Sequence, residues 1–486
     1  MRQTLSYFIA ALLWVTGSLL YAQDAQLLNQ YDYVGTARYT GMAGAMAAVG
    51  ADPSAVLDNP AGLGLFRRFD VSLTLHEQLD YTHQRGDSRS QFHSSFMLPQ
   101  VSFVFAFENK NTGSALQFCN FMVSYNRLHT FHRKLLGQNA NQPTIANLML
   151  DQVDGLSEAT VSGSGFNNPT TGWLSEMGYQ TGMIDPYDID QYGDTIWDTW
   201  SSYYNTQPAN GYMSKESGSI DEFNLHWGAL FSHHFSLGLG LNIRSLEYYK
   251  ESTYEEVLTT DYQNYAQINS RLHQKGIGVS GTIGILYQPI RPLRMGLSFQ
   301  TPTALRLTTR TSGDMYLQDG TLKGECSTLI SRNEERMTQP MRVTAGMAFL
   351  FDKYALVSMQ YDFRHHKTTN DMHTFHIGGE VVLSNNFFLN LGYAYETAFL
   401  ADEQPTLLPL NSVRTDAEYR TIGSAHIVGA GAGYRNRFIV VHLGYRYRQQ
   451  RYNIYPFASE YVTPDPYDMT ATTHNIVLTL GWHTSR

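Results

Sequence analysis

Residues 474–482 read HNIVLTLGW, and apolar side chains alternate along them with small or polar ones. Successive residues of a β-strand point to opposite faces, so every second residue shares a face. The apolar face of this segment consists of Ile476, Leu478, Leu480 and Trp482. The alternation predicts a strand near the C-terminus that has one apolar and one polar face and ends on an aromatic residue.

The same alternation recurs along the chain from residue 69 and predicts fourteen strands. An even number of strands is typical of bacterial single-chain barrels. The expected strands are Val71–Tyr81, Phe96–Phe107, Leu116–Thr130, Glu222–Phe231, Phe235–Tyr249, Arg271–Tyr287, Leu293–Arg310, Met341–Phe351, Tyr354–His365, His373–Leu383, Phe387–Phe399, Thr421–Tyr434, Phe438–Gln450 and Thr472–Trp482.

Soluble β-sandwiches and membrane barrels both contain alternating strands, but three features favour the barrel. Aromatic residues gather at strand ends, as at Tyr361 with Phe363 and at Tyr445 with Tyr447, which suits interfacial girdles. Many strands reach about ten residues, the length of a tilted membrane crossing. Short connections alternate with long ones. We therefore expect an all-β fold, a transmembrane antiparallel barrel of fourteen strands over residues 69–486.

The first residues have the pattern of a secretory signal peptide. Arg2 supplies a positive charge, Phe8–Leu20 is an apolar stretch too short to span a bilayer comfortably as a helix, and Ala22 ends a cleavage site. We expect residues 1–22 to be removed on export. Together with the barrel pattern, this predicts a multi-pass protein of the bacterial outer membrane.

Composition and motifs argue against several functions. The net charge of −9 disfavours a nucleic-acid partner, because no basic face is concentrated enough to neutralise phosphates. Cys119 and Cys326 form neither a disulfide framework nor a metal cluster, and we expect two separate thiols. No G-x-S-x-G motif occurs, and the paired histidines fall on opposite strand faces. We therefore expect no enzyme, no metal site and no cofactor.

Residues 23–68 precede the first strand and show no strand character. A barrel of fourteen strands encloses a lumen that its own side chains cannot fill, so a channel or a plug is expected. The segment 36–66, TARYTGMAGAMAAVGADPSAVLDNPAGLGLF, is rich in small residues, which pack closely. Pro53 and Pro60 force turns in it. These properties suit a compact plug, or hatch, inside the barrel.

This segment resembles the N-terminal hatch of the long-chain fatty-acid transporter (FadL-like) family of outer-membrane proteins, which also includes aromatic-hydrocarbon channels. The resemblance implies that an apolar ligand is captured at the outer loops, held inside, and released sideways past the hatch beside a kinked third strand. Asn120 and Asn126 are the candidate polar breaks in that strand. The motif positions that match are Gly41, Met42, Gly44, Asn59, Pro60, Ala61 and Gly62.

The longest connection, residues 136–218, is low in charge and rich in apolar side chains. Residues 143–159 have roughly helical apolar spacing and predict one short amphipathic helix. Farther along lie Trp173, Leu174, Met177 and Met183. Two interpretations stay open: a surface cap that packs on itself, and an apolar landing surface for a ligand.

Four arginines fall on the polar faces of their strands and are expected in the lumen. They either form ion pairs with Asp362, Glu380 or Glu396, or one or two of them bind a ligand carboxylate. The four are Arg244, Arg306, Arg342 and Arg364.

The favoured function is passive uptake of hydrophobic small molecules, either long-chain fatty acids or aromatic hydrocarbons, by a monomer surrounded by outer-membrane lipid. One alternative is a surface receptor for haem or another large apolar ligand. The other is a structural or adhesive surface barrel without transport.

Overall fold

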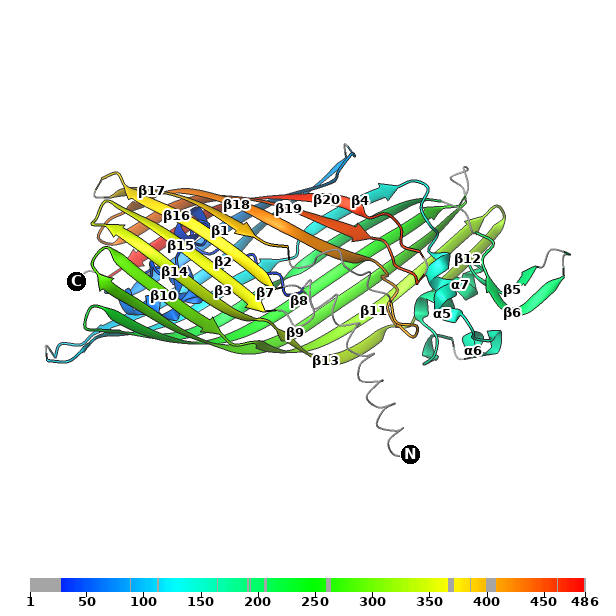
Figure 1. Cartoon of the computed structure of the whole chain (residues 1–486), viewed down its shortest axis with the longest axis horizontal. Coiled ribbons are helices and arrows are strands. Elements are labelled where there is room, and N and C mark those ends of the chain that lie inside the picture. The colour runs from blue at the N-terminus through cyan, green and yellow to red at the C-terminus, as the bar shows by residue number, and fades with distance from the viewer. Residues whose placement is uncertain are drawn as a thin grey trace, which may run out of the picture.

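A computed structural model describes residues 28–484 except 88, 112, 164, 190–191, 193, 205–207, 259–263, 366–370, 385, 399–407 and 461. The expected signal peptide, residues 1–22, lies outside the described residues. The chain forms one closed antiparallel barrel of fourteen strands, as predicted. The barrel is long and narrow, with short turns at the end that holds the C-terminus (Figure 1). Among the described residues, no helix is long and apolar enough to cross a membrane.

Three of the fourteen wall strands are interrupted and count as two segments each. The closing pair joins β20 to β1, from Asp70 opposite His483 to Gln84 opposite Met469. A further strand, β12 (Leu322–Ser327), pairs with β11 beyond the wall. The wall consists of β1 (Asp70–Gln84), β2 (Ser90–Glu108), β3 (Leu116–Thr130) with β4 (Arg133–Asn139), β7 (Ala209–Phe231), β8 (Phe235–Val257), β9 (Tyr265–Ile290), β10 (Leu293–Gln300) with β11 (Thr303–Asp319), β13 (Ser331–Gln339) with β14 (Met341–Phe351), β15 (Ala355–His365), β16 (Met372–Val382), β17 (Phe387–Glu396), β18 (Tyr419–Arg435), β19 (Ile439–Tyr455) and β20 (Tyr467–His483).

The outward face of the wall carries an apolar belt. On β9, Ile277, Val279 and Ile283 are exposed, whereas Ser280 and Thr282 between them are buried inside the barrel. Over this part of β9, the period of two places the large apolar residues outside, where lipid replaces a core. The alternation in the sequence therefore identified both the strand and its outward face.

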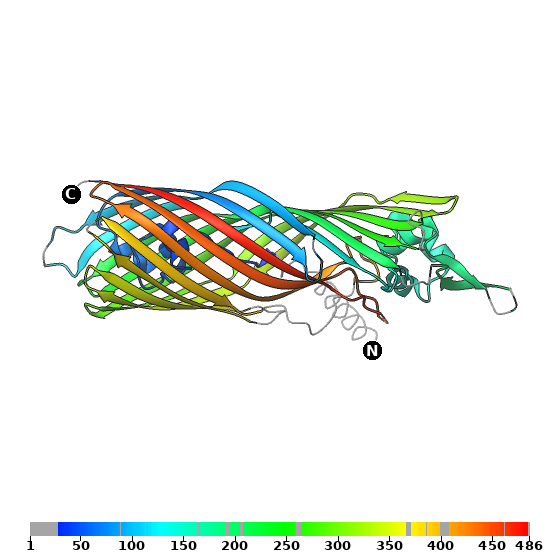
Figure 2. The same cartoon turned by 90° about the horizontal axis from the view of Figure 1, so that it is seen from above.

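Residues 28–66 form the hatch, which lies inside the barrel near its short-turn end (Figures 1 and 2). Its elements are α3 (Ala37–Gly41), α4 (Pro53–Asp58) and the 3-10 helix η1 (Pro60–Leu65). Asp52 caps α4 by accepting a hydrogen bond from the Ser54 backbone N–H. The hatch backbone touches the wall at Gly238, where an added Cβ would lie 2.1 Å from the Pro60 carbonyl carbon. Only glycine permits this approach.

The large connection is shorter than expected. The third strand continues through β4 to Asn139, and β7 begins at Ala209, so the connection spans residues 140–208 and not 136–218. It contains α5 (Ala146–Val153), α6 (Glu158–Ser162), the 3-10 helix η2 (Gly165–Asn167), α7 (Trp173–Thr181) and the hairpin β5 (Asp185–Ile189) with β6 (Thr195–Ser201). These elements form an outer segment at the end opposite the hatch (Figure 1).

The apolar side chains of the outer segment pack together and against the barrel mouth. Trp173, Leu174, Met177 and Met183 are all buried, and α5 covers the predicted amphipathic helix. Leu174, Met177 and Met183 share a core with inward-facing residues of the barrel's outer strand ends, such as Met315. Of the two interpretations, the structure favours the cap for these residues.

Two neighbouring wall strands are interrupted at the same level. Thr301 and Pro302 separate β10 from β11, and Pro340 separates β13 from β14. Proline has no N–H to donate to the ladder. Gln300 and Thr303 both face inward although they are three residues apart, so the outward positions change from odd to even numbers across the break.

Candidate functional site

The lumen beyond the hatch contains an apolar section. Inward-facing residues of eight wall strands form one cluster with Tyr33, Met42 and other hatch residues. The lumen of a membrane barrel is ordinarily polar, so an apolar section suits an apolar ligand. The inward-facing members are Val104, Met122, Leu128, Phe131, Ile220, Leu246, Tyr248, Leu272, Leu305, Leu307, Ala348 and Leu356.

Beside this cluster the wall is unpaired between β2 and β3. Their ladder runs from Glu108 opposite Phe118 to Gln100 opposite Asn126 and stops there. Beyond that point, in the part of the chain the structure describes, β2 pairs only with β1, and β3 and β4 pair only with β7. The next residue of β2, Pro99, has no N–H and sits at an irregularity of the β1–β2 pairing. We call this unpaired stretch the seam.

In the described part of the chain, β2 meets the end of β3 and the start of β4 across the seam through side chains. The Thr130 hydroxyl lies 3.4 Å from the Met97 sulfur, and the rings of His93 and His132 are 5.7 Å apart between centroids. Next to Thr130, Phe131 reaches into the apolar lumen cluster and packs 4.8 Å from the Tyr248 ring. The seam therefore lies directly beside the apolar section of the lumen.

The hatch contacts the last residue pair before the seam. The Tyr33 hydroxyl donates a hydrogen bond to Asn126 Oδ1 (2.9 Å), and the Ser54 hydroxyl donates one to Gln100 Oε1 (3.2 Å). The two hatch hydroxyls lie 3.0 Å apart. Movement of this part of the hatch would therefore break hydrogen bonds to both wall strands at the seam's edge.

The two asparagines expected to break the third strand have different roles. Asn126 does mark the end of pairing with β2. Asn120 lies within the paired region, and its amide donates to the backbone carbonyls of Leu63 (2.8 Å) and Phe66 (2.9 Å). The structure thus places Asn120 at the hatch, away from the break. The irregularity lies at Pro99 of the neighbouring strand β2, a residue that the pattern of the third strand could not indicate.

The hatch motif residues are buried between hatch and wall. Asn59 is fully buried; its amide donates to the carbonyls of Ala47 (3.0 Å) and Ile285 (3.1 Å), and its Oδ1 accepts from the Ala61 N–H. Met42 is buried, Gly44 has φ 82°, and an added Cβ on Gly41 would lie 2.2 Å from Asn390 Oδ1. Pro60 packs against Gly238, and Gly62 faces Gly50 within the hatch. The motif therefore occupies the contact between hatch and wall.

Three of the four arginines lie inside the barrel. Arg244 pairs with Glu222 (2.6 Å). Arg342 lies between hatch Asp58 (2.8 Å) and wall Asp362 (3.0 Å).

The expected partners Glu380 and Glu396 bind other cations. Glu380 pairs with hatch Arg38 (2.6 Å), and Glu396 pairs with Arg448 (2.9 Å). Arg364 is the third buried arginine: its guanidinium carbon lies 4.4 Å from the Tyr31 ring centroid, and no carboxylate forms an ion pair with it among the described residues.

The prediction that Arg306 faces the lumen is wrong. Arg306 is exposed on the outward face of β11, while Leu305 and Leu307 beside it face inward. Its orientation was deduced by extending the alternation of β10. The break at Pro302 changes which positions face outward, so the deduction fails beyond it.

A small cavity of about 40 Å³ separates hatch from wall beside these charges. Tyr31, Gly44, Arg342 and Arg364 are among the residues that line it. Such a volume holds only a few water molecules. The hatch therefore packs closely against the wall beside Arg364.

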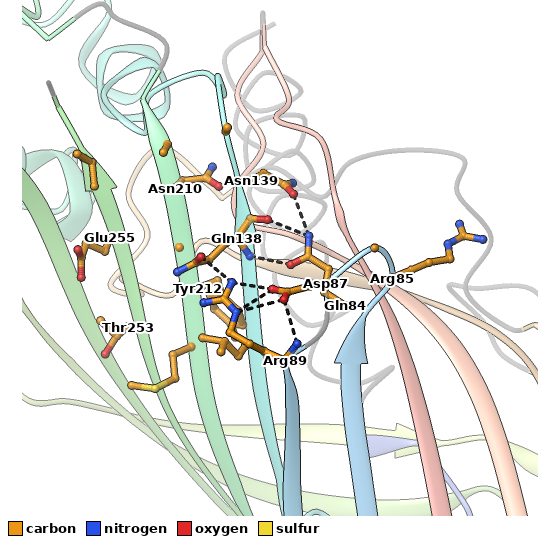
Figure 3. A pocket seen from close by; sticks show the side chains of 17 residues that line it. Gln84, Arg85, Asp87, Arg89, Gln138, Asn139, Asn210, Tyr212, Thr253 and Glu255 are labelled. Carbon is orange, nitrogen blue, oxygen red and sulfur yellow. Dashed lines mark hydrogen bonds and ion pairs between the residues drawn. The ribbon is translucent and has the colours of Figure 1, made fainter. Parts of the chain in front are cut away.

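A hollow of about 990 Å³ lies beyond the seam toward the outer end (Figure 3). The turn between β1 and β2 forms one side of it, and β4, β7 and β8 form the other. Arg89 donates hydrogen bonds to Asp87 and to Gln138 of β4, and Gln84 donates to the Gln138 carbonyl. These bonds join the two sides where backbone pairing is absent.

Glu256 attaches the outer segment to the end of β8. Its carboxylate accepts hydrogen bonds from the Thr144 hydroxyl (2.7 Å), the Ile145 N–H (2.6 Å) and the Tyr254 hydroxyl (2.7 Å). Burial raises the pKa of Glu256 from 4.5 to about 7, although these donors act in the opposite direction.

No family model and no curated protein matches this sequence. Among solved structures, a FadL homologue from Pseudomonas aeruginosa is 12% identical, with a TM-score of 0.54 over 94% of this chain and 100% of that chain. The monoaromatic hydrocarbon channel CymD is 10% identical, with a TM-score of 0.51 over 94% and 100%.

The toluene transporter TbuX from Ralstonia pickettii is also similar: 12% identical, with a TM-score of 0.51 over 92% of this chain and 98% of that chain. The similarity spans nearly the full length of all three proteins. The expectation drawn from the hatch motif is confirmed at the level of the fold. This chain has the fold shared by the FadL homologue and these hydrocarbon channels.

Proposed function

We propose that this protein is an outer-membrane channel for the passive uptake of hydrophobic small molecules, which leave the lumen sideways through the seam. The observation that carries the proposal is the unpaired wall between β2 and β3 beside an apolar section of the lumen. The names of the structural neighbours, a FadL homologue and hydrocarbon channels, are consistent with an apolar ligand.

A sideways route suits the physics of an apolar ligand. Transfer of apolar surface from the lumen cluster to water is unfavourable by roughly 25 cal/mol per Å². Exit through the seam leads directly into lipid and avoids this cost. The hatch, which blocks the lumen and holds Gln100 and Asn126 at the seam, is the gate in this proposal.

Arg364 is the residue we assign to a ligand carboxylate. It is buried, lines the cavity at the hatch, and lacks an ion pair among the described residues. Each buried CH₂ of an alkyl chain contributes about 0.8 kcal/mol, so apolar area supplies most of the affinity and the head group adds selectivity. Neutral aromatic hydrocarbons would bind without using Arg364.

Cross-linking across the seam tests the proposal. The free thiols Cys119 and Cys326 are first replaced by serine, and Met97→Cys with Thr130→Cys is joined by a short cleavable cross-linker. The control joins Phe103→Cys to Val123→Cys, which face each other within the paired part of the same strands. Uptake of radiolabelled oleate and toluene should fall toward the level of cells without the protein in the seam variant only, and cleavage should restore it.

Unchanged uptake with the seam closed would contradict sideways release. A second comparison uses cells with and without the protein, supplied with oleate, toluene, haem or a sugar. A difference for haem alone would indicate the receptor, and a difference for sugar alone would indicate an ordinary porin. No difference for any of the four would indicate a structural or adhesive barrel.

A further inference from the structure

An arginine-rich patch covers the outward face of β11 and β13. In the register of these strands, Arg306 lies directly opposite Arg336, and Arg310 lies directly opposite Arg332. All four side chains are exposed. Like charges directly opposite each other destabilise a strand pair. The Thr308–Glu334 pair lies between the two arginine pairs on the same face, so one carboxylate stands among four guanidinium groups.

The carboxylates near the patch do not neutralise it. Glu334 pairs with Arg332 (2.9 Å), and no ion pair is formed by Arg306, Arg310 or Arg336 among the described residues.

On the neighbouring β9, the cations have partners. Arg271 pairs with Asp314 (2.9 Å), and Lys275 approaches Glu247 at 4.0 Å. Within the described residues, Arg306, Arg310 and Arg336 are therefore the patch arginines left to bind a ligand.

The patch begins where the apolar belt ends. Arg306 lies opposite Ile277 on β9, which is 63% exposed, and Ala304 lies opposite Val279. Beside Arg310, a hollow of about 320 Å³ is lined by Lys215, Arg271, Glu251 and Ile330, among others, and Ile330 is 77% exposed. Exposed apolar side chains thus lie next to the cationic ones on this part of the outer face.

We propose that this patch binds the phosphate groups of a membrane lipid head group, with the lipid's acyl chains on the belt below. Guanidinium groups bind phosphate oxygens in bidentate geometry, and a phosphate between opposed arginines removes their repulsion. Basic side chains at the edge of an apolar belt are the arrangement that anionic lipid recognition requires. The adjoining apolar groups favour a lipid over a free phosphate ion.

Native mass spectrometry of the full protein in detergent tests this site. The probes are lipid A, which is phosphorylated, and the same lipid after phosphatase treatment. Phosphorylated lipid A should bind at least about tenfold more tightly. The triple variant Arg306→Gln, Arg310→Gln and Arg336→Gln should bind it about a hundredfold more weakly, since each surface arginine contributes about fivefold.

The matched control is Lys110→Gln, Arg291→Gln and Lys353→Gln, which removes the same charge from exposed residues at the short-turn end. This control should bind lipid A as the unmodified protein does. The unmodified protein alone can overturn the proposal: it would do so by binding the two lipids equally. Equal losses in both triple variants, or displacement of the lipid by inorganic phosphate at equal concentration, would overturn it as well.

Discussion

Arg364 differs from the other buried arginines of the lumen in what surrounds its charge. Arg244 and Arg342 are matched by carboxylates, so they belong to the ion pairs that fill the barrel. Arg364 stacks on Tyr31 of the hatch, which stabilises a cation without neutralising it. A ligand carboxylate would supply the missing charge and would touch the hatch at the same place.

Arg364→Gln should therefore weaken oleate binding about tenfold or more, since a charge-assisted hydrogen bond contributes roughly 1.5–3 kcal/mol. Binding of toluene should stay unchanged, because toluene has no group for the guanidinium. Calorimetry on the purified protein measures both ligands, and Arg364→Lys, which keeps the charge, serves as control. Parallel losses for oleate and toluene would show a structural role.

The raised pKa of Glu256 predicts that the attachment of the outer segment depends on pH. Its folded pKa of about 7 exceeds the ordinary 4.5, so the folded state holds the proton more tightly. The resulting stability is present below about pH 4.5 and is lost as the pH rises through about 7. Protease cleavage within residues 140–208 should accelerate over this range, and Glu256→Gln should remove the change. A pH-independent cleavage rate in the unmodified protein would contradict the shift.

At the scale of elements, the wall strands could be predicted because their alternation reflects a local cause. Each strand has lipid on one face, so a segment such as 474–482 shows its pattern whatever fills the lumen. The sequence predicts the second half of β7, from Glu222 to Phe231. Its first half, 209–221, rises beyond the apolar belt, where polar residues occupy both faces and the alternation disappears.

The site could be predicted only in part, because it depends on register between strands. The seam begins at Pro99 on β2, next to the last paired residues, Gln100 and Asn126. The outward position of Arg306 depends on the interruption at Pro302. Motif recognition located the hatch, but its hydrogen bonds to Gln100 and Asn126 join residues that are far apart in the chain.

The outer segment should be separable from the wall. Replacing residues 146–204 with a short Gly-Ser linker leaves every wall strand intact. We expect a barrel that still migrates differently on gels before and after heating, with slower capture of oleate, because exposed apolar groups of the β5–β6 hairpin such as Trp197 are lost. Uptake measured at limiting oleate checks this. Trp197→Ala alone should reproduce part of the loss, and normal capture by both variants would refute it.

At the scale of the whole molecule, the hatch is tied to the wall by ion pairs to strands distant in the chain. Arg38 binds Glu380 on β16, Asp58 binds Arg342 on β14, and Asp32 binds Arg446 on β19. The wall itself is closed by backbone hydrogen bonds that do not involve the hatch. The hatch therefore blocks the lumen without being part of the barrel's own pairing.

Deletion of residues 28–66 should leave a folded barrel whose lumen charges become hydrated. In planar lipid bilayers this variant should conduct ions, whereas the full protein should conduct few or none. Circular dichroism and heat-dependent gel migration confirm that the variant has folded. A folded variant without conductance would show that wall side chains alone close the lumen.

The pairing of β20 with β1 joins the first and the last strand of the wall. Before these two strands pair, the sheet is open and has two free edges, each a template for a foreign strand. One pairing therefore removes both edges. The hatch directly precedes β1 in the chain, so the last strand pairs with the strand to which the hatch is joined.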